Sequence, residues 1–366
     1  LKSTFGNNNY WFNTSKFKNA VEIKIKSENE VIDFLVPKEL VSASSIRLFV
    51  LWTTLPSLVL IIIALIFLKN QTRPLVKLAK AAEKFGTMFG VSSLGTASIE
   101  EIANLITTPK LFQLYVHKDQ GLNDYLIDQC KEHNFDTMAV TVDSSVGGNR
   151  ERDLYTGFTI PLNLSLKSII SFATHPAWAF NYFTKPKWEL SNLNKHVTEG
   201  TNLMTSIGDY FTKMLDNSLS WKKIEEINKK WGKPFAIKGI MSVEDAKKAV
   251  DVGASAIMIS NHGGRQLDGS RSPFDQLEEV VNAVGDKIDV ICEGGIRRGT
   301  HILKALSLGA KACSGGRMYL YALAAGGQKG VEKALGNLKK EIERDMILMG
   351  VSNISELSRK NLRFRV

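Results

Sequence analysis

Apolar and polar positions divide the chain at one uninterrupted apolar run, residues 48–68, which carries no charged side chain. About 20 apolar residues in a helix cross a bilayer core roughly 30 Å thick, so this run predicts a membrane-spanning helix, with a buried core helix as the alternative. Pro56 lies inside the run, and spanning helices tolerate such a proline. Basic residues follow closely, namely Lys69, Arg73, Lys77, Lys80 and Lys84. The positive-inside rule therefore predicts that the following chain is cytoplasmic.

Residues 1–47 are expected to form an extracytoplasmic remnant of a sensor domain. Residues 21–26 alternate apolar and polar side chains, and residues 32–36 form a short apolar run, so both segments predict strands. A segment of this length buries little core by itself.

Beyond Gly86 the pattern changes to short apolar runs separated by helix-like segments. The runs that predict strands are 87–92, 112–116, 137–142, 235–238, 256–260, 289–293 and 312–315. Between them, Ser98 and Ser242 fit helix N-caps and Gly253 fits a helix stop. Alternating strands and helices predict a parallel sheet, and functional residues at the strand ends favour a TIM-type α/β barrel over an open sheet. The first strand is not followed by GxGxxG, which weighs against a dinucleotide-binding fold.

One long interruption, residues 155–220, separates the third and fourth of these strands. It carries several aromatic residues: Trp178, Phe180, Tyr182, Phe183 and Trp188. Loops of such length are uncommon unless they cover a site, so the segment predicts a lid or a contact surface.

Composition narrows the function classes. Lysine and arginine outnumber aspartate and glutamate by 47 to 37, a net charge of +10 that suits nucleic acid or an anionic membrane surface. Because no nucleic-acid-binding motif accompanies this charge, we favour the membrane and expect no nucleic acid partner. The three cysteines, Cys130, Cys292 and Cys313, form no CxxC pair, which predicts neither a disulfide framework nor a metal site.

Several motifs in the barrel-like part carry a family resemblance. They are Phe112–Val116, Thr141–Asp143, Gly148–Glu151, Lys238–Gly239, Ser260–Asp268 (SNHGGRQLD) and Gly294–Arg297. Together they resemble the FMN-dependent α-hydroxy-acid dehydrogenase and oxidase family, which includes glycolate oxidase and the L-lactate dehydrogenases. The resemblance runs from about Ala79 to the C-terminus. His175–Ala179 and Leu219–Trp221 look most like bacterial L-lactate dehydrogenases.

The resemblance implies roles that the residue chemistry supports. His262 ends a strand and precedes two glycines, and as a base it would take the substrate proton; a structural histidine is the alternative. Asp143 would orient that histidine, with a helix N-cap as the alternative. Arg265 would grip the substrate carboxylate, with Arg150 as a second cation or a surface ion-pair member. Tyr115 would offer its hydroxyl to the substrate, unless it only packs the core.

The same resemblance implies a binding site for FMN. Lys238 closes an apolar strand, where a lysine needs a partner, and the family places it beside the flavin pyrimidine as a catalytic and cofactor-binding residue. Ring and ribityl contacts would come from Ser92, Gln113, Thr141 and Ser260. Phosphate contacts would come from Gly294, Gly295, Arg297, Gly316 and Arg317. Glu293 stands where the family usually has aspartate, and its carboxylate would reach one methylene further toward the cofactor.

The expected reaction is oxidation of a small L-2-hydroxy acid, most closely L-lactate, to the 2-oxo acid. The electrons would pass from FMN to a quinone-type membrane acceptor, and an oxidase that uses oxygen is the alternative. The expected location is the bacterial inner membrane, single-pass, with the barrel in the cytoplasm. A homo-oligomer is compatible with the resemblance.

The region before the barrel resembles a second family. Residues 70–83 resemble the start of a HAMP linker in osmosensor-type histidine kinases, a resemblance that covers residues 1–86. Residues 69–86 suit both this linker and the first barrel helix, so we expect a fused chain with the barrel over residues 87–366. The first barrel strand of the family would then be missing and FMN binding weak. A non-catalytic sensor fragment fused to an inert barrel piece is the alternative to an enzyme.

Overall fold

The computed structural model describes residues 9–27, 30–38, 50, 53–59, 74–157, 165–175, 190–193 and 213–364. The chain divides into two units, residues 1–72 and residues 73–366.

The first unit contains a three-stranded antiparallel sheet in the order β1-β2-β3. Its strands are β1 (Tyr10–Asn13), β2 (Ala20–Ser27) and β3 (Glu30–Pro37). Val21 and Ile25 lie two pleats apart on one face and are buried, whereas Lys24 on the other face pairs with Asp33 at 3.2 Å. The two predicted strands are confirmed as β2 and β3, and β1 adds a strand that was not predicted.

The predicted membrane-spanning run is described only in part. Residues 53–59 are helical, and most of the remaining run lies outside the described residues. Within the described part of the chain, no helix has both the length and the apolar character that crossing a bilayer requires. The spanning helix therefore stays a prediction.

The second unit is built on a parallel sheet of seven strands that pair in chain order from β4 to β10. The strands are β4 (Phe89–Ser92), β5 (Lys110–Tyr115), β6 (Thr137–Thr141), β7 (Phe235–Ile240), β8 (Ala256–Ile259), β9 (Asp289–Glu293) and β10 (Ala312–Ser314). Every predicted strand is present. Among the described residues β4 and β10 are the outer strands of this sheet.

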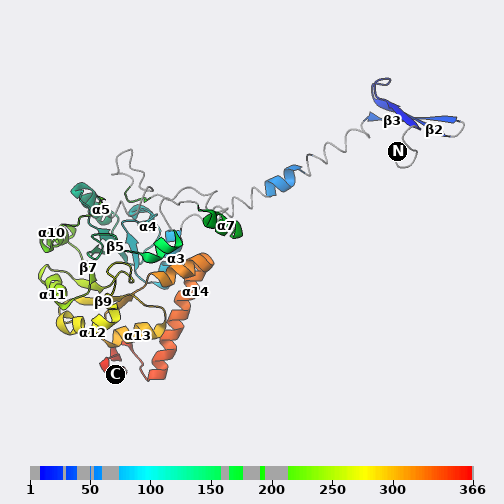
Figure 1. Cartoon of the computed structure of the whole chain (residues 1–366). Helices are drawn as coiled ribbons and strands as arrows, with labels where there is room; N and C mark the ends of the chain where they lie inside the picture. The colour runs from blue at the N-terminus through cyan, green and yellow to red at the C-terminus, as the bar shows by residue number, and fades with distance from the viewer. Residues whose placement is uncertain are drawn as a thin grey trace. The chain divides into compact units, whose positions relative to one another are not determined.

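Helices occur between successive strands, and α5 (Gln120–Glu132), α10 (Trp221–Trp231), α11 (Val243–Asp251), α12 (Pro273–Val284) and α13 (Gly299–Ser307) lie around the outside of the sheet (Figure 1). The other helices of this unit are α3 (Pro74–Phe85), α4 (Ile99–Ala103), α6 (Glu151–Thr156), α7 (Leu166–Thr174) and α14 (Arg317–Met349). Two 3₁₀ turns, η1 (Ile354–Glu356) and η2 (Arg359–Asn361), follow. Because each helix returns the chain to the same end of the sheet, all seven strands run parallel.

The predicted helix signals are present in the structure. The Ser98 hydroxyl accepts a hydrogen bond from the Glu101 amide at 3.1 Å, and Ser242 accepts from Asp245 at the same distance. Gly253 adopts a φ of +77° just after α11, a conformation that glycine adopts without strain. These caps satisfy amides and carbonyls that the helix ends would otherwise leave unpaired.

The junction segment forms α3, which belongs to the second unit. This helix packs against α14, where Lys84 pairs with Glu332 at 2.6 Å. The Glu83 carboxylate accepts hydrogen bonds from the amides of Thr107 and Thr108 at 2.8 and 2.9 Å. The helix is thus fixed both to the segment before β5 and to the last long helix.

The long interruption is described only in pieces. It contains α7, which was not predicted, and Asn192, whose side-chain oxygen accepts from the Ile99 amide at 3.0 Å. The aromatic residues predicted to line a lid lie outside the described residues. Its role as a lid stays a prediction.

Candidate active site

The predicted catalytic residues meet at the C-terminal edge of the parallel sheet. Tyr115 ends β5, Asp143 follows β6, Lys238 lies in β7 and His262 follows β8. The C-terminal ends of parallel strands share one edge, so side chains distant in sequence converge there.

The imidazole of His262 is held by a carboxylate from the neighbouring strand end. His262 Nδ1 lies 3.1 Å from Asp143 Oδ1, and the two side chains are only 17% and 13% exposed. His262 has a φ of +56°, and Gly263 and Gly264 continue in the same left-handed region. Three successive residues of this kind make a tight turn, which directs the imidazole toward Asp143.

Burial alone would raise the pKa of Asp143, but the combined effect of several partners is larger and lowers it. The hydrogen bond with His262, the charge of Lys238 and the hydrogen bond with Ser144 leave this pKa below its ordinary value. Asp143 is therefore ionised near neutral pH. An ionised Asp143 favours a proton on His262 Nδ1 and leaves Nε2 free to act as a base.

Gly239 makes the approach of Asp143 possible. A Cβ atom at Gly239 would lie 2.7 Å from both Cβ and Cγ of Asp143, and the φ of Gly239 is +103°. A glycine directly after Lys238 therefore serves two needs, a left-handed backbone and close contact with the next strand end.

Tyr115 faces the other nitrogen of the imidazole. Its hydroxyl lies 3.4 Å from His262 Nε2, and the two rings stack with centroids 6.5 Å apart. Burial and the charge of Asp143 raise the pKa of Tyr115 to about 12. The phenol is thus protonated at neutral pH and can donate a hydrogen bond to a substrate oxygen beside Nε2.

Cationic side chains gather beside this pair. Burial, and then the charges of Arg150 and Arg317, lower the pKa of Arg265. The Nε of Arg150 is buried and has no hydrogen-bond partner in the described part of the chain. Arg317 donates to the carbonyl of Gly263 and so lies against the His262 turn. Mutually repelling guanidinium groups with an unused buried donor form a site for an anion.

A belt of polar side chains runs along the same edge from β4 to β6. Ser92 donates to the Gln113 side-chain oxygen at 2.7 Å, and Gln113 donates to Thr141 at 2.6 Å. Gln113 thus uses both ends of its amide within the belt. The belt brings together three of the residues predicted to contact the flavin ring or its ribityl chain.

A second polar group lies at the ends of β7 to β9. Lys238 Nζ lies 2.7 Å from Glu293 Oε1, and both contact the hydroxyl of Ser260 at 3.1 and 3.2 Å. Ser260 is fully buried, and the lysine side chain is 12% exposed. The partner that a lysine needs in this apolar strand is therefore Glu293.

The residues predicted to bind phosphate lie after β9 and β10. Gly294 and Gly295 have positive φ angles of 133° and 71°, and Gly316 caps α14. The amide of Arg297 donates to the His301 ring at 3.3 Å. Glycine turns followed by a helix N-terminus present amide groups that suit a phosphate.

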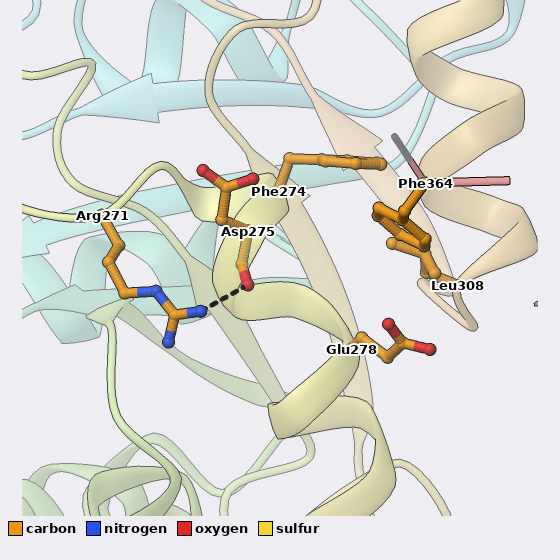
Figure 2. A pocket seen from close by; sticks show the side chains of 6 residues that line it. All are labelled: Arg271, Phe274, Asp275, Glu278, Leu308 and Phe364. Carbon is orange, nitrogen blue, oxygen red and sulfur yellow. Dashed lines mark hydrogen bonds between the residues drawn. The ribbon is translucent and has the colours of Figure 1, made fainter. Parts of the chain in front are cut away.

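A cavity of about 410 Å³ lies elsewhere, beside α12 and the C-terminal segment. Figure 2 shows Phe274, Leu308 and Phe364 around it, with Arg271 donating to the Asp275 carbonyl at 3.2 Å. None of the predicted site residues lines this cavity, so it is distinct from the catalytic cluster.

The donor set at the sheet edge fits FMN. A hydroxyl, an amide and an ammonium group occur along one row of strand ends, beside two glycine turns that offer backbone amides. These are the group types that bind an isoalloxazine ring, a ribityl chain and a phosphate. Sequence reasoning missed Ser144 and Gln266, whose amide nitrogen donates to the Asp143 carbonyl at 2.9 Å. Ser144 directly follows Asp143, and this adjacency was the only signal.

Comparison with known proteins identifies the family of the chain. Residues 70–364 match the family described as FMN-dependent dehydrogenase. An L-lactate dehydrogenase of Xanthomonas campestris pv. campestris (strain 8004) is 40% identical over 285 residues, which cover 77% of this chain and 73% of that protein. One of Vibrio cholerae serotype O1 (strain M66-2) is 39% identical over 289 residues, 78% of this chain and 76% of that protein.

Solved structures share the fold. The crystal structure of a monotopic membrane protein, (S)-mandelate dehydrogenase, is 34% identical with a TM-score of 0.74, and the match covers 80% of this chain and 77% of that one. A mandelate oxidase structure is 32% identical with a TM-score of 0.64, covering 78% and 72%. The chain therefore belongs to the FMN-dependent dehydrogenase family, an assignment that makes FMN its cofactor.

Proposed function

We propose that the chain oxidises L-2-hydroxy acids, with L-lactate as the preferred substrate, to the corresponding 2-oxo acids. The observation that carries this proposal is the environment of His262. Its Nδ1 is hydrogen-bonded to the buried carboxylate of Asp143. Its Nε2 faces the hydroxyl of Tyr115, which lies near the charged group of Arg265. A 2-hydroxy acid presents one hydroxyl and one carboxylate, which match the base and the cations.

His262 Nε2 takes the proton of the substrate hydroxyl. The positive charge that develops on the imidazole lies 3.1 Å from the Asp143 carboxylate, which stabilises it. Tyr115 donates to the substrate oxygen and positions it near Nε2. These three side chains support oxidation because losing the hydroxyl proton prepares the α-carbon to lose a hydride.

Arg265 and Arg150 hold the substrate carboxylate. A bound carboxylate relieves the repulsion among the guanidinium groups and gives the buried Arg150 Nε an acceptor. Two anchored groups, the carboxylate and the hydroxyl, fix which face of the α-carbon meets the cofactor.

The polar belt and the glycine turns would hold FMN. Ser92, Gln113 and Thr141 would bond the ring system, and Gly294 with Gly295 would meet the phosphate. When bound, FMN supplies the two-electron acceptor for the substrate hydride. Lys238 would face the ring from β7, with its charge shared by Glu293.

We further propose a quinone-type membrane acceptor for the electrons. The L-lactate dehydrogenases among the relatives support a dehydrogenase, whereas the mandelate oxidase structure supports the alternative, oxygen. Turnover with a short-chain quinone under argon, compared with peroxide production in air, separates the two. Peroxide formation at the rate of quinone reduction would establish the oxidase instead.

Membrane attachment through residues 48–68 is part of the proposal. In its described helical part the Thr54 and Ser57 hydroxyls donate to the carbonyls of Val50 and Thr53 at 2.6 Å, so these polar groups are satisfied within the helix, as hydrocarbon surroundings require. Leu55 and Leu58 are exposed.

The chain should resist alkaline carbonate extraction, and a Leu55→Arg, Leu58→Arg double variant should be released. Ile354→Arg is the control because Ile354 is equally exposed in the second unit. Release of the unaltered chain would refute the attachment.

The central test of the proposed function is anaerobic reduction of the bound flavin. The FMN-loaded chain should lose its oxidised-flavin absorbance on mixing with L-lactate, and His262→Gln should abolish this loss while retaining FMN. If the loaded chain shows no reduction by any small 2-hydroxy acid, the non-catalytic alternative holds.

A further inference from the structure

Ser144 contacts both the catalytic base His262 and the carboxylate of Asp143 that orients it. It directly follows Asp143 and is 2% exposed. Its hydroxyl oxygen lies 3.0 Å from Asp143 Oδ1 and 3.2 Å from His262 Nδ1. Together with the 3.1 Å contact between Nδ1 and Oδ1, the three atoms form a nearly equilateral triangle.

The protons in this triangle can be assigned. An ionised carboxylate only accepts, so the single hydroxyl proton of Ser144 points at Asp143 Oδ1. The lone pairs of that hydroxyl then face His262, whose Nδ1–H has two acceptors, Oδ1 and the serine oxygen. In the other tautomer the hydroxyl proton would have to turn from Oδ1 to the Nδ1 lone pair, and Oδ1 would then receive no hydrogen bond from either group, which is unfavourable.

Within the ranges that the structure describes, the Asp143 carboxylate has few other side-chain partners. Asp143 Oδ2 has no hydrogen-bond partner in the described part of the chain. The carboxylate therefore depends on Oδ1, where Ser144 and His262 are the two side-chain donors among the described residues.

We propose that Ser144 is a positioning residue that fixes the tautomer of His262, with the proton on Nδ1 and the lone pair of Nε2 toward the substrate. This inference rests on the proposed function in taking Nε2 as the base. A serine that merely fills space would act through its volume, whereas a positioning serine acts through its hydroxyl.

Threonine and valine at this position separate the two roles, because they have nearly the same shape and only threonine has the hydroxyl. Ser144→Val and Ser144→Ala should lower the limiting rate of flavin reduction by L-lactate about tenfold, as expected for the loss of one hydrogen bond. The substrate dissociation constant and FMN content should stay within about twofold of the unaltered chain. Ser144→Thr should recover the rate. Equal rates in Thr and Val variants would overturn the proposal.

A second measurement does not depend on turnover. ¹⁵N spectra of histidine-labelled protein report which ring nitrogen carries the proton, and the His262 signals are those lost in His262→Gln. The unaltered chain and Ser144→Thr should show one Nδ1-protonated form, whereas Ser144→Val should show a mixture of tautomers. Identical tautomers in all three would refute the role of Ser144. Absence of flavin reduction in the unaltered chain would refute only the proposed function, since the spectra still decide the tautomer.

Discussion

Replacing Asp143 by asparagine keeps the shape of the side chain and removes its charge. The carboxylate lies 3.1 Å from His262 Nδ1 and both side chains are mostly buried. At this separation an effective dielectric constant of ~20 gives a Coulomb attraction of about 5 kcal/mol for the charged imidazole. The hydrogen bond to a charged group alone is worth up to about 3 kcal/mol. Since about 1.4 kcal/mol corresponds to a factor of ten, the rate of substrate oxidation should fall by about two to four orders of magnitude.

The assay is anaerobic rapid mixing of the FMN-loaded variant with L-lactate, followed by oxidised-flavin absorbance. FMN content and the dissociation constant of a non-reducible carboxylate analogue serve as controls, because Arg265 and Arg150 should still hold the carboxylate. A flavin reduction rate of the same order as that of the unaltered chain would refute the reasoning. It would show that Asp143 does not stabilise the charge that develops on His262.

Three further predictions concern glycine packing, the lysine partner and acid stability. Gly239→Ala should lower the free energy of unfolding by about 1–3 kcal/mol in denaturant titrations and slow flavin reduction, because the new Cβ meets Asp143. Gly86→Ala is the control, because Gly86 also has a positive φ but no atom lies within 4 Å of its Cβ position. Glu293→Gln should raise the reduction potential of bound FMN in dye-coupled titration, because the positive charge of Lys238 is then no longer compensated by a carboxylate. An unchanged potential would show that Lys238 and Glu293 do not lie beside the flavin ring. Lys223 and Ser218 lower the pKa of Asp216 to about 2, so Asp216→Asn should destabilise the fold at neutral pH. That deficit should shrink in urea titrations as pH falls from about 4 toward about 2, and a constant deficit would contradict it.

The strands of the sheet could be predicted because each is a short apolar run between helix signals. Their order followed because successive parallel strands joined by helices become neighbours. Two elements were missed for different reasons. β1 has no apolar alternation and is mostly exposed, so its only strand signal is the aromatic run of Tyr10, Trp11 and Phe12. α7 carried a readable signal, since Ser165 accepts from the Ser168 amide and Ile169 and Ile170 follow Leu166 at helical spacing.

The site was predicted at the level of residue types and missed at the level of hydrogen bonds. His262, Asp143 and Arg265 belong to recognisable motifs, but the contact of Ser144 with Nδ1 depends on how the loop after β6 turns toward the loop after β8. The link between Lys238 and Glu293 illustrates the same limit. The sequence showed that the lysine needed a partner, whereas only the adjacent ends of β7, β8 and β9 identify which one.

These contacts place most of the charge of the site in two pairs, His262 with Asp143 and Lys238 with Glu293, and the Lys238 charge also lowers the pKa of Asp143. Near His262, the buried carboxylate is matched by the imidazole, so the arginine charges beside it are left to attract the substrate anion. Near the polar belt, Glu293 compensates Lys238 within hydrogen-bond distance. Binding of the substrate and electron uptake by the flavin should therefore respond to different substitutions. Changing Arg265 should act mainly on substrate affinity, whereas changing Glu293 should act mainly on the flavin potential, because no described contact joins the two groups directly.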